Sequence, residues 1–503
     1  MDNFIVKPYN SSNLSESLSN SFTSSLVISS KKHFIYLEEY LEEIETKTIL
    51  IEENYLSKAY NSDFSFYYAK CFQVYPKFCR RVHFFSKKFN QSKLETDIVS
   101  KDASLLKFYL GYIVVKPIPF AVIGPTLLKT YKITDKSRKR NFFGVRPYLV
   151  HLLGHSIIID SLAFQEQDKT VSACATTAIW CMLHKASKTF ETKILNPNQI
   201  THNAGITAAG GGRLFPNKGL NTRQMCEAIY KSGLVTEIRV VDSQFDTEAI
   251  RLIKQLVYAY SKIGIPLILN IEVPFEQDEL SAHAVTICGF KIKRRATKIN
   301  FKDEVTFISD RIEKIYVHDD QWGPFSRIDL NKTALRSSWS EFDEHGKRDT
   351  ISKEILIPVY PNIRISYDDV LSIVYGIDGV LTLAFEDHFE DDLQWEIFLV
   401  HSNNFKDELR KSKVEKNTKL KILKSSYPKY IWQISCFVGS EKILDYIFDA
   451  TSLSTSMYGL DGICYYSDLK KYINEFVEMN PDLCAKFEHD NCVDFIQFVK
   501  LSN

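Results

Sequence analysis

The chain has 503 residues, 63 Lys+Arg against 62 Asp+Glu, a formal net charge of +1 and 45% hydrophobic residues. This length predicts two or three domains, and the balanced charge without a long basic run argues against nucleic acid or an anionic membrane surface as a partner. The ten cysteines are scattered without a Cys-x-x-Cys pair, and no signal peptide is recognisable, which predicts reduced thiols and a cytoplasmic location.

The first region, residues 1–145, is predicted to be a mixed α/β domain. A Ser- and Asn-rich opening is typical of a loop-like lead-in, and the apolar spacing that follows predicts one helix and two strands. These expected elements cover 10–25, 33–44, 47–56 and 112–118. The most apolar long window, 105–128, is interrupted by two lysines and three prolines, so it predicts buried strands joined by turns and no membrane span.

The second region, residues 146–350, contains the residues that could carry out chemistry. It predicts two strands, a helix that begins at Cys174, two more helices and then three antiparallel strands, an order typical of an α+β fold. Thr222 is expected to cap the second helix and Gly233 to end it. Three glycines at 210–212 lack the Lys-Ser/Thr of a P-loop, so no phosphate site is expected. The ranges are 148–153, 155–164, 174–186, 220–233, 248–264, 266–273, 283–292 and 312–320.

The third region, residues 351–503, is predicted to be an α/β accessory domain. Helices are expected over 367–379 and 467–480, with strands over 395–402, 431–439 and 444–451. No catalytic pattern is present in this region. A role in recognition, regulation or scaffolding follows, with a regulatory protein as a conceivable partner.

Cys174 stands where a short polar segment turns into an apolar helix, and two interpretations compete for it. A lone cysteine in an apolar helix is usually a buried filler. At the start of a helix, however, the dipole and the free backbone N–H groups favour a nucleophilic thiolate and can hold an oxyanion. Gln165 and Gln167, in the preceding loop, are candidates for a second oxyanion donor.

A nucleophilic thiol needs a base and a group that orients the base. His283 begins an apolar strand between two alanines, and the next strand ends in Asp319 and Asp320. Strand alternation places Asp319 on the face of Val317, which favours Asp319 as the orienting group. His202 and His318 are weaker candidates for the base because neither begins an apolar strand. The scattered histidines also lack the spacing of a zinc site.

Residues from about 160 to 335 resemble the papain-like cysteine peptidase superfamily, most closely the bacterial double-glycine leader peptidases that process bacteriocins. That family places Gln and then Cys at the head of a helix, His at the start of a strand, and Asp or Asn at the end of the next strand. The resemblance implies these roles for Gln167, Cys174, His283 and either Asp319 or Asp320. Gln167 lies one residue farther from the cysteine than in the family, and "DQWG" at 320–323 resembles the family's "NSWG" turn, which favours Asp320.

The resemblance implies an α+β protein with a papain-like core over 146–350, flanked by two mixed α/β domains. It implies a thiol protease with a Cys-His-Asp triad that hydrolyses a peptide or isopeptide bond and needs no cofactor or metal. The large flanking domains and the lack of a recognisable signal peptide predict a dedicated protein substrate in the cytoplasm. Two alternatives remain open. One is an acyltransferase or transglutaminase-like enzyme with the same triad, and the other is a non-catalytic binding module on a peptidase fold.

Overall fold

The computed structural model describes residues 3–100, 103–133, 138–168, 170–171, 173–205, 219–274, 279–294, 305–331, 334–343, 346–385, 393–453, 459–465, 467–482 and 485. The chain forms two compact units. Unit 1 comprises residues 1–250, 265–291 and 314–358, and unit 2 comprises residues 251–264, 292–313 and 359–503. The predicted boundaries at 145 and 350 do not follow these units, because unit 1 joins the first predicted region to most of the second, and unit 2 includes residues 251–264 and 292–313 of the second.

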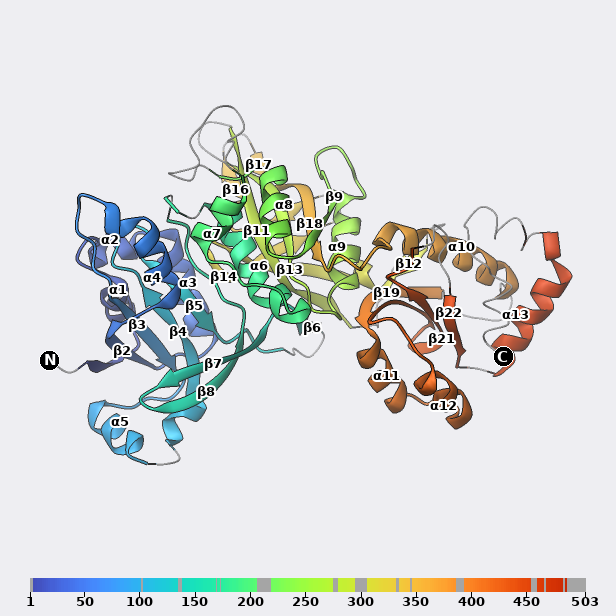
Figure 1. Ribbon diagram of the computed structural model, residues 1–503, viewed down its shortest axis with the longest axis horizontal. Helices are drawn as coiled ribbons and strands as arrows, with labels where there is room; N and C mark the ends of the chain where they lie inside the picture. The colour runs from blue at the N-terminus through green and yellow to red at the C-terminus, as the bar shows by residue number, and fades with distance from the viewer. Residues whose placement is uncertain are drawn as a thin grey trace. The chain divides into compact units, whose positions relative to one another are not determined.

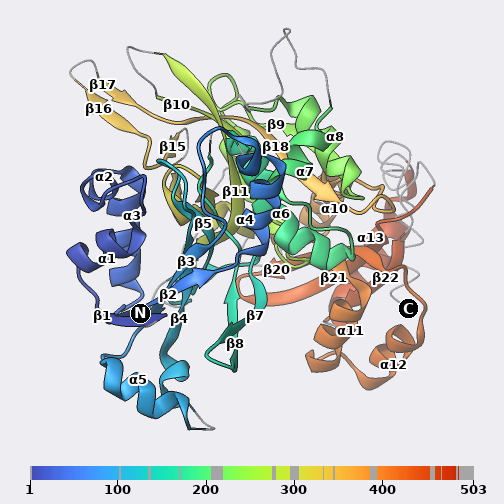
Figure 2. The ribbon, with the colours of Figure 1, turned by 60° about the vertical axis from the view of Figure 1, so that its left-hand side comes forward.

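Unit 1 begins with a five-stranded sheet in which each strand is antiparallel to the next. Helices α1, α2 and α3 cover one face of this sheet and α4 covers the other (Figure 2). The elements are β1 (Phe4–Pro8), α1 (Ser11–Leu18), α2 (Ser25–Ser29), α3 (Lys32–Glu43), β2 (Thr48–Tyr55), α4 (Lys58–Phe66), β3 (Cys79–Phe85), α5 (Gln91–Ile98), β4 (Tyr109–Val115) and β5 (Ile123–Leu128).

A second sheet of eight strands has the order β15-β14-β13-β11-β10-β18-β9, with β6 paired to β11. Figure 1 and Figure 2 show α6 beside β11 of this sheet. A separate hairpin, β7 with β8, leads into α6. The elements are β6 (Arg138–Asn141), β7 (Arg146–Leu152), β8 (His155–Ser161), α6 (Cys174–Phe190), α7 (Pro197–Asn203), α8 (Thr222–Lys231), β9 (Val235–Val240), β10 (Leu267–Pro274), β11 (Leu280–Lys293), β13 (Ile312–Asp319), β14 (Gly323–Leu330), β15 (Leu335–Arg336), β16 (Glu341–Asp343), β17 (Gly346–Arg348) and β18 (Ile351–Val359).

The two sheets of unit 1 share one apolar core. Phe34 and Leu41 of α3 pack in the same cluster as Tyr316 of β13 and Phe325 of β14, and all four side chains are buried. Burial of aromatic side chains is among the largest stabilising contributions in a protein core. The first region is therefore joined to the strand that ends in Asp319 through shared packing.

Unit 2 is built on a second five-stranded sheet, β12-β19-β20-β21-β22, in which β12 is parallel to β19 and the remaining pairs are antiparallel. Its core includes Phe398, Phe405 and Ile431. The elements are α9 (Ala249–Ala259, most of which lies in this unit), β12 (Thr306–Phe307), α10 (Tyr367–Phe385), β19 (Leu393–His401), α11 (Ser402–Lys411), α12 (Lys416–Lys424), β20 (Tyr430–Val438), β21 (Glu441–Asp449), β22 (Gly459–Cys464) and α13 (Ser467–Met479).

Two local predictions were wrong. The Ser- and Asn-rich opening contains α1, because Asn10 caps the helix through Asn13 N and its Leu14 and Leu18 are fully buried. Helix α8 is capped by Asn221, not by Thr222, through a capping box with Gln224. The glycines at 210–212 and most of the charged connection at 293–304 lie outside the described residues.

The described residues confirm a mixed α+β chain with several antiparallel sheets. No helix among them is both long and apolar enough to cross a bilayer. The window at 105–128 forms β4 and β5 with a turn between them, as predicted.

Candidate active site

Cys174 is the first residue of α6, and its side chain is partly exposed while the nine residues after it are buried. The cap residue, Ala173, has an extended backbone and offers no side-chain hydrogen bond to the first turn. The backbone N–H groups in the first turn of an α-helix have no partner within the helix. Here no side chain at the cap occupies them either. A rigid helix thus presents one thiol beside uncapped backbone donors.

His283 lies on β11 opposite Ile271 of β10, and its side chain is buried. A hydrogen bond from Thr286 Oγ1 to Ala178 O, 2.8 Å long, ties β11 to α6. Thr286 is three residues after His283, and Ala178 is one helical turn after Cys174. This bond therefore fixes the strand that carries the imidazole against the helix that carries the thiol.

Asp319 is the last residue of β13 and faces His283, with 2.9 Å between Asp319 Oδ1 and His283 Nε2. Its carboxylate also accepts hydrogen bonds from Gln321 N to Oδ1 at 3.0 Å and from Trp339 Nε1 to Oδ2 at 2.8 Å. The Cys174 side chain is near enough to His283 for its hydrogen bond to be among the causes that raise the pKa of the imidazole. Because Asp319 engages Nε2, Nδ1 is the ring nitrogen left for the thiol.

The charges of this group reinforce one another. Burial opposes protonation of His283, but the charge and hydrogen bond of Asp319, the hydrogen bond of Cys174 and the charge of Asp320 outweigh it and raise the pKa of His283 well above its usual value. Burial would raise the pKa of Asp319, yet His283 and the donors Trp339 and Gln321 lower it. Asp319 therefore stabilises the protonated form of His283, the form that the imidazole reaches when it accepts a proton.

Asp320 lies close to the same imidazole but in a different environment. Its Oδ1 is 3.6 Å from His283 Nε2, and neither carboxyl oxygen has a hydrogen-bond partner among the described residues. Burial, followed by the neighbouring Asp319 charge, raises the pKa of Asp320 to about 7. The structure thus brings both aspartates to His283, and Asp319 alone makes the hydrogen bond.

Gln167 lies in the segment between β8 and α6 and is partly buried. Its side chain forms no hydrogen bond with any described residue, so its role at an oxyanion stays a prediction. Gln165, the other candidate, is buried.

Among the described contacts, neither alternative base joins the group formed by His283 and Asp319. His318 is held by backbone groups at both ring nitrogens, Nε2 with Leu162 O and Nδ1 with Phe325 N. Burial lowers the pKa of His318 to about 4, so it stays neutral. His202, at the end of α7, is exposed to solvent.

Sequence reasoning missed Trp339, which is a direct partner of Asp319. Its ring also packs edge-on against His283, with 5.5 Å between the ring centroids. Trp339 lies twenty residues after Asp319 and beyond β14 and β15, and no motif in this sequence joins the two positions. Sequence reasoning also assigned the first region no part in the site, although His33 Nε2 lies 2.7 Å from Asp320 O.

His283, Asp319 and Asp320 are also the described residues that could together hold a metal ion, since their ligand atoms lie within 4.8 Å of one another. The Asp319 carboxylate also accepts hydrogen bonds from Gln321 N and Trp339 Nε1, which hold it in position to orient the imidazole. The donor set therefore fits an orienting carboxylate better than a metal centre.

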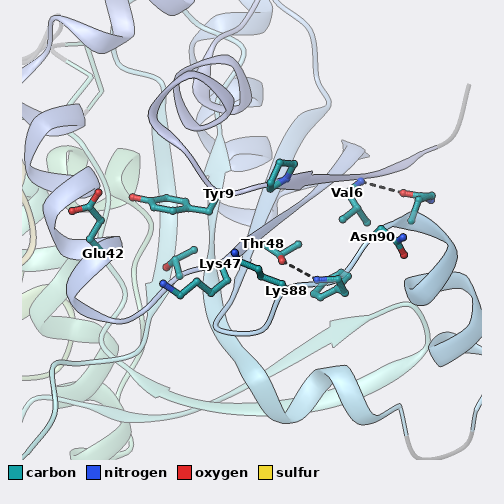
Figure 3. Close-up of a pocket in the computed structure, with 11 residues that line it drawn as sticks. Val6, Tyr9, Glu42, Lys47, Thr48, Lys88 and Asn90 are labelled. Atoms are coloured by element: carbon teal, nitrogen blue, oxygen red, sulfur yellow. Dashed lines mark hydrogen bonds between the residues drawn. The ribbon is translucent and has the colours of Figure 1, made fainter.

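A pocket of about 760 Å³ in the first region shares no residue with this group (Figure 3). It is lined by β1, β2 and the start of α5, and its polar residues include Tyr9, Glu42, Lys47, Lys88 and Asn90. We place the candidate site at Cys174 and not at this pocket, because nucleophile, base and orienting group meet only there among the described residues.

No protein-family model matches the chain, and no curated protein matches it in sequence. The candidate site therefore depends on the geometry of its own side chains.

Proposed function

We propose that this chain is a cysteine peptidase with a papain-like core, which hydrolyses a peptide or isopeptide bond in a dedicated protein substrate. The observation that carries the proposal is the contact chain from Cys174 through His283 to Asp319, in which each group can perform its expected role. The packing of α6 against the antiparallel strand β11 supports the papain-like interpretation.

In the proposed reaction, His283 takes the thiol proton and Cys174 Sγ attacks the carbonyl carbon of the scissile bond. A carbon–sulfur bond forms, and the negative charge passes to the carbonyl oxygen. His283 then returns the proton to the leaving amine as the carbon–nitrogen bond breaks. Water, deprotonated by His283, hydrolyses the resulting thioester, which releases the acid and regenerates the thiol.

Asp319 serves this cycle by fixing the imidazole orientation and stabilising its charged form. The oxyanion would be held by the Cys174 backbone N–H, with Gln167 as the second donor that the family resemblance implies. Neither the formation of the thioester nor its hydrolysis calls for a cofactor.

The test is a digestion of a proteome-derived peptide library in ¹⁸O-labelled water, with product termini identified by mass spectrometry and Cys174→Ala as the control. Hydrolysis predicts new carboxyl termini that carry ¹⁸O and are absent with Cys174→Ala. Products in which an added amine replaces the water-derived oxygen would indicate the acyltransferase alternative. A library left intact by both proteins would contradict the proposal and favour the binding module.

A further inference from the structure

Lys32, in the first turn of α3, holds its ammonium over two indole rings. Lys32 Nζ lies 4.9 Å from the ring centroid of Trp339 and 5.2 Å from that of Trp322. The two rings are themselves edge to face, with 5.7 Å between their centroids. Each such cation–π contact at an exposed site contributes about 0.5–1 kcal/mol, so the ammonium has a defined position.

This ammonium is separated from the proposed base by a single side chain. Trp339 contacts Lys32, packs on His283 and donates to Asp319. A positive charge at this position attracts negatively charged groups within about 10 Å, the distance beyond which salt at 0.1 M screens exposed charges.

The rest of α3 is fixed to the loops around the site. Lys31 Nζ forms an ion pair with Glu166 Oε1 at 3.0 Å, in the segment that leads to Cys174. Tyr36 donates from its hydroxyl to Pro324 O at 2.7 Å, just after the aspartate pair. A side chain at Gly323 would collide with the Tyr36 ring, so the glycine of the "DQWG" turn is required by the approach of α3.

The two adjacent lysines, Lys31 and Lys32, differ in whether the protein neutralises their charge. Lys31 is paired with a carboxylate inside the protein, whereas Lys32 is exposed and forms no ion pair with any described residue. The indole faces occupy one side of the Lys32 ammonium, and its N–H donors on the solvent side remain available. A carboxylate is the group that such a donor set binds best.

We propose that Lys32 is a specificity-determining residue, whose ammonium binds a carboxylate of the substrate near the scissile bond. This inference rests on the proposed peptidase function and names its substrate class, a protein that carries an acidic side chain or a free C-terminal carboxylate beside the cleaved bond.

The test uses the full chain and two proteome-derived peptide libraries, one with free and one with amidated C-termini. Cleavage sites flanked by Asp or Glu in both libraries indicate acidic side chains, and cleavage confined to the free library indicates the terminal carboxylate. Lys32→Gln is expected to raise KM for the preferred peptides about three- to tenfold with kcat changed less than about twofold, as expected for loss of an ion pair. Lys32→Glu is expected to move the preference to basic peptides.

Lys93→Glu, an equal charge change at an exposed position of α5, is the matched control and is expected to leave the preference unchanged. Cleavage that depends on Cys174 but keeps the same preference in Lys32→Glu would overturn the role of Lys32 and leave the peptidase proposal standing. Absence of any Cys174-dependent cleavage would overturn both. Circular dichroism of the Lys32 variants should match that of the wild type, and their thermal midpoint should be only slightly lower, because each lost cation–π contact contributes about 0.5–1 kcal/mol.

Discussion

Trp339 donates a hydrogen bond to Asp319 Oδ2 at 2.8 Å, while Asp319 Oδ1 faces His283 Nε2 at 2.9 Å. The carboxylate is thus held from two sides, by an indole that orients it and by the imidazole that it orients. This arrangement makes Trp339 a positioning residue for the proposed triad.

Trp339→Phe keeps an aromatic ring but removes the indole N–H that reaches Asp319. A hydrogen bond to a charged group contributes about 1.5–3 kcal/mol, so kcat should fall roughly 10- to 100-fold with KM little changed. Trp322→Phe is the matched control, because Trp322 Nε1 has no hydrogen-bond partner among the described residues. Steady-state kinetics of the two variants should separate them, and equal losses would remove Trp339 from this role.

Asp319→Asn removes the charge that contributes most to raising the pKa of His283. We expect kcat/KM to fall about 10²- to 10⁴-fold, as for other triads that lose their orienting carboxylate. Because the imidazolium then loses its proton at a lower pH, the alkaline decline of activity should also move to lower pH. Asp320→Asn should have a smaller effect on both quantities, and a larger loss in Asp320→Asn would reverse the assignment of the two aspartates.

Asp320 should also affect stability in a pH-dependent way. Its pKa is about 7 in the folded protein against 3.8 for an ordinary aspartate, so the folded state retains a proton that the unfolded state loses. The contribution of the protonated Asp320 to the free energy of unfolding is then fully present below about pH 4. It declines as the pH rises through 7, by on the order of 1 kcal/mol per pH unit.

Asp320→Asn should remove this decline, so its thermal midpoint relative to the wild type should be higher at pH 8 than at pH 5. Asp160→Asn, at an exposed position of β8, serves as the control and should follow the wild type at both pH values. A constant difference between Asp320→Asn and the wild type across this range would contradict the environment described for Asp320.

Metal removal distinguishes the triad from a metal centre built on His283, Asp319 and Asp320. Millimolar chelator should leave the peptidase activity unchanged, since every proposed step uses side chains alone. Added Zn²⁺ should inhibit, because thiolate and imidazole are ligands that zinc prefers. Activity that is lost in chelator and restored by a divalent metal would argue for the metal interpretation.

Local signals in the sequence were enough to predict the elements that carry the proposed triad. A polar segment before an apolar helix located Cys174, and apolar strands located His283 and Asp319, because each of these patterns depends only on neighbouring residues. The helix α3 was also predicted, from its apolar spacing. The loop-like lead-in was wrong because buried leucines were outweighed by their Ser and Asn neighbours.

The surroundings of the triad could not be predicted in the same way. His33 and Asp320 are 287 residues apart in the chain, and Trp339 reaches Asp319 only after the chain has passed through β14 and β15. Such contacts depend on tertiary packing, which leaves no periodic or spacing signal in a single sequence. The choice between Asp319 and Asp320 likewise required the directions of the two carboxyl groups.

The most direct measurement of the central claim is the alkylation rate of Cys174 by iodoacetamide at pH 7, followed by mass spectrometry in the wild type and in His283→Gln. Cys181, buried in the same helix with a pKa raised by that burial, is the internal control. The account predicts rapid labelling of Cys174, no labelling of Cys181 in the folded protein, and a rate for Cys174 at least about tenfold lower in His283→Gln, as expected when an activating base is lost. Equal rates in the two proteins, or a Cys174 as inert as Cys181, would contradict it.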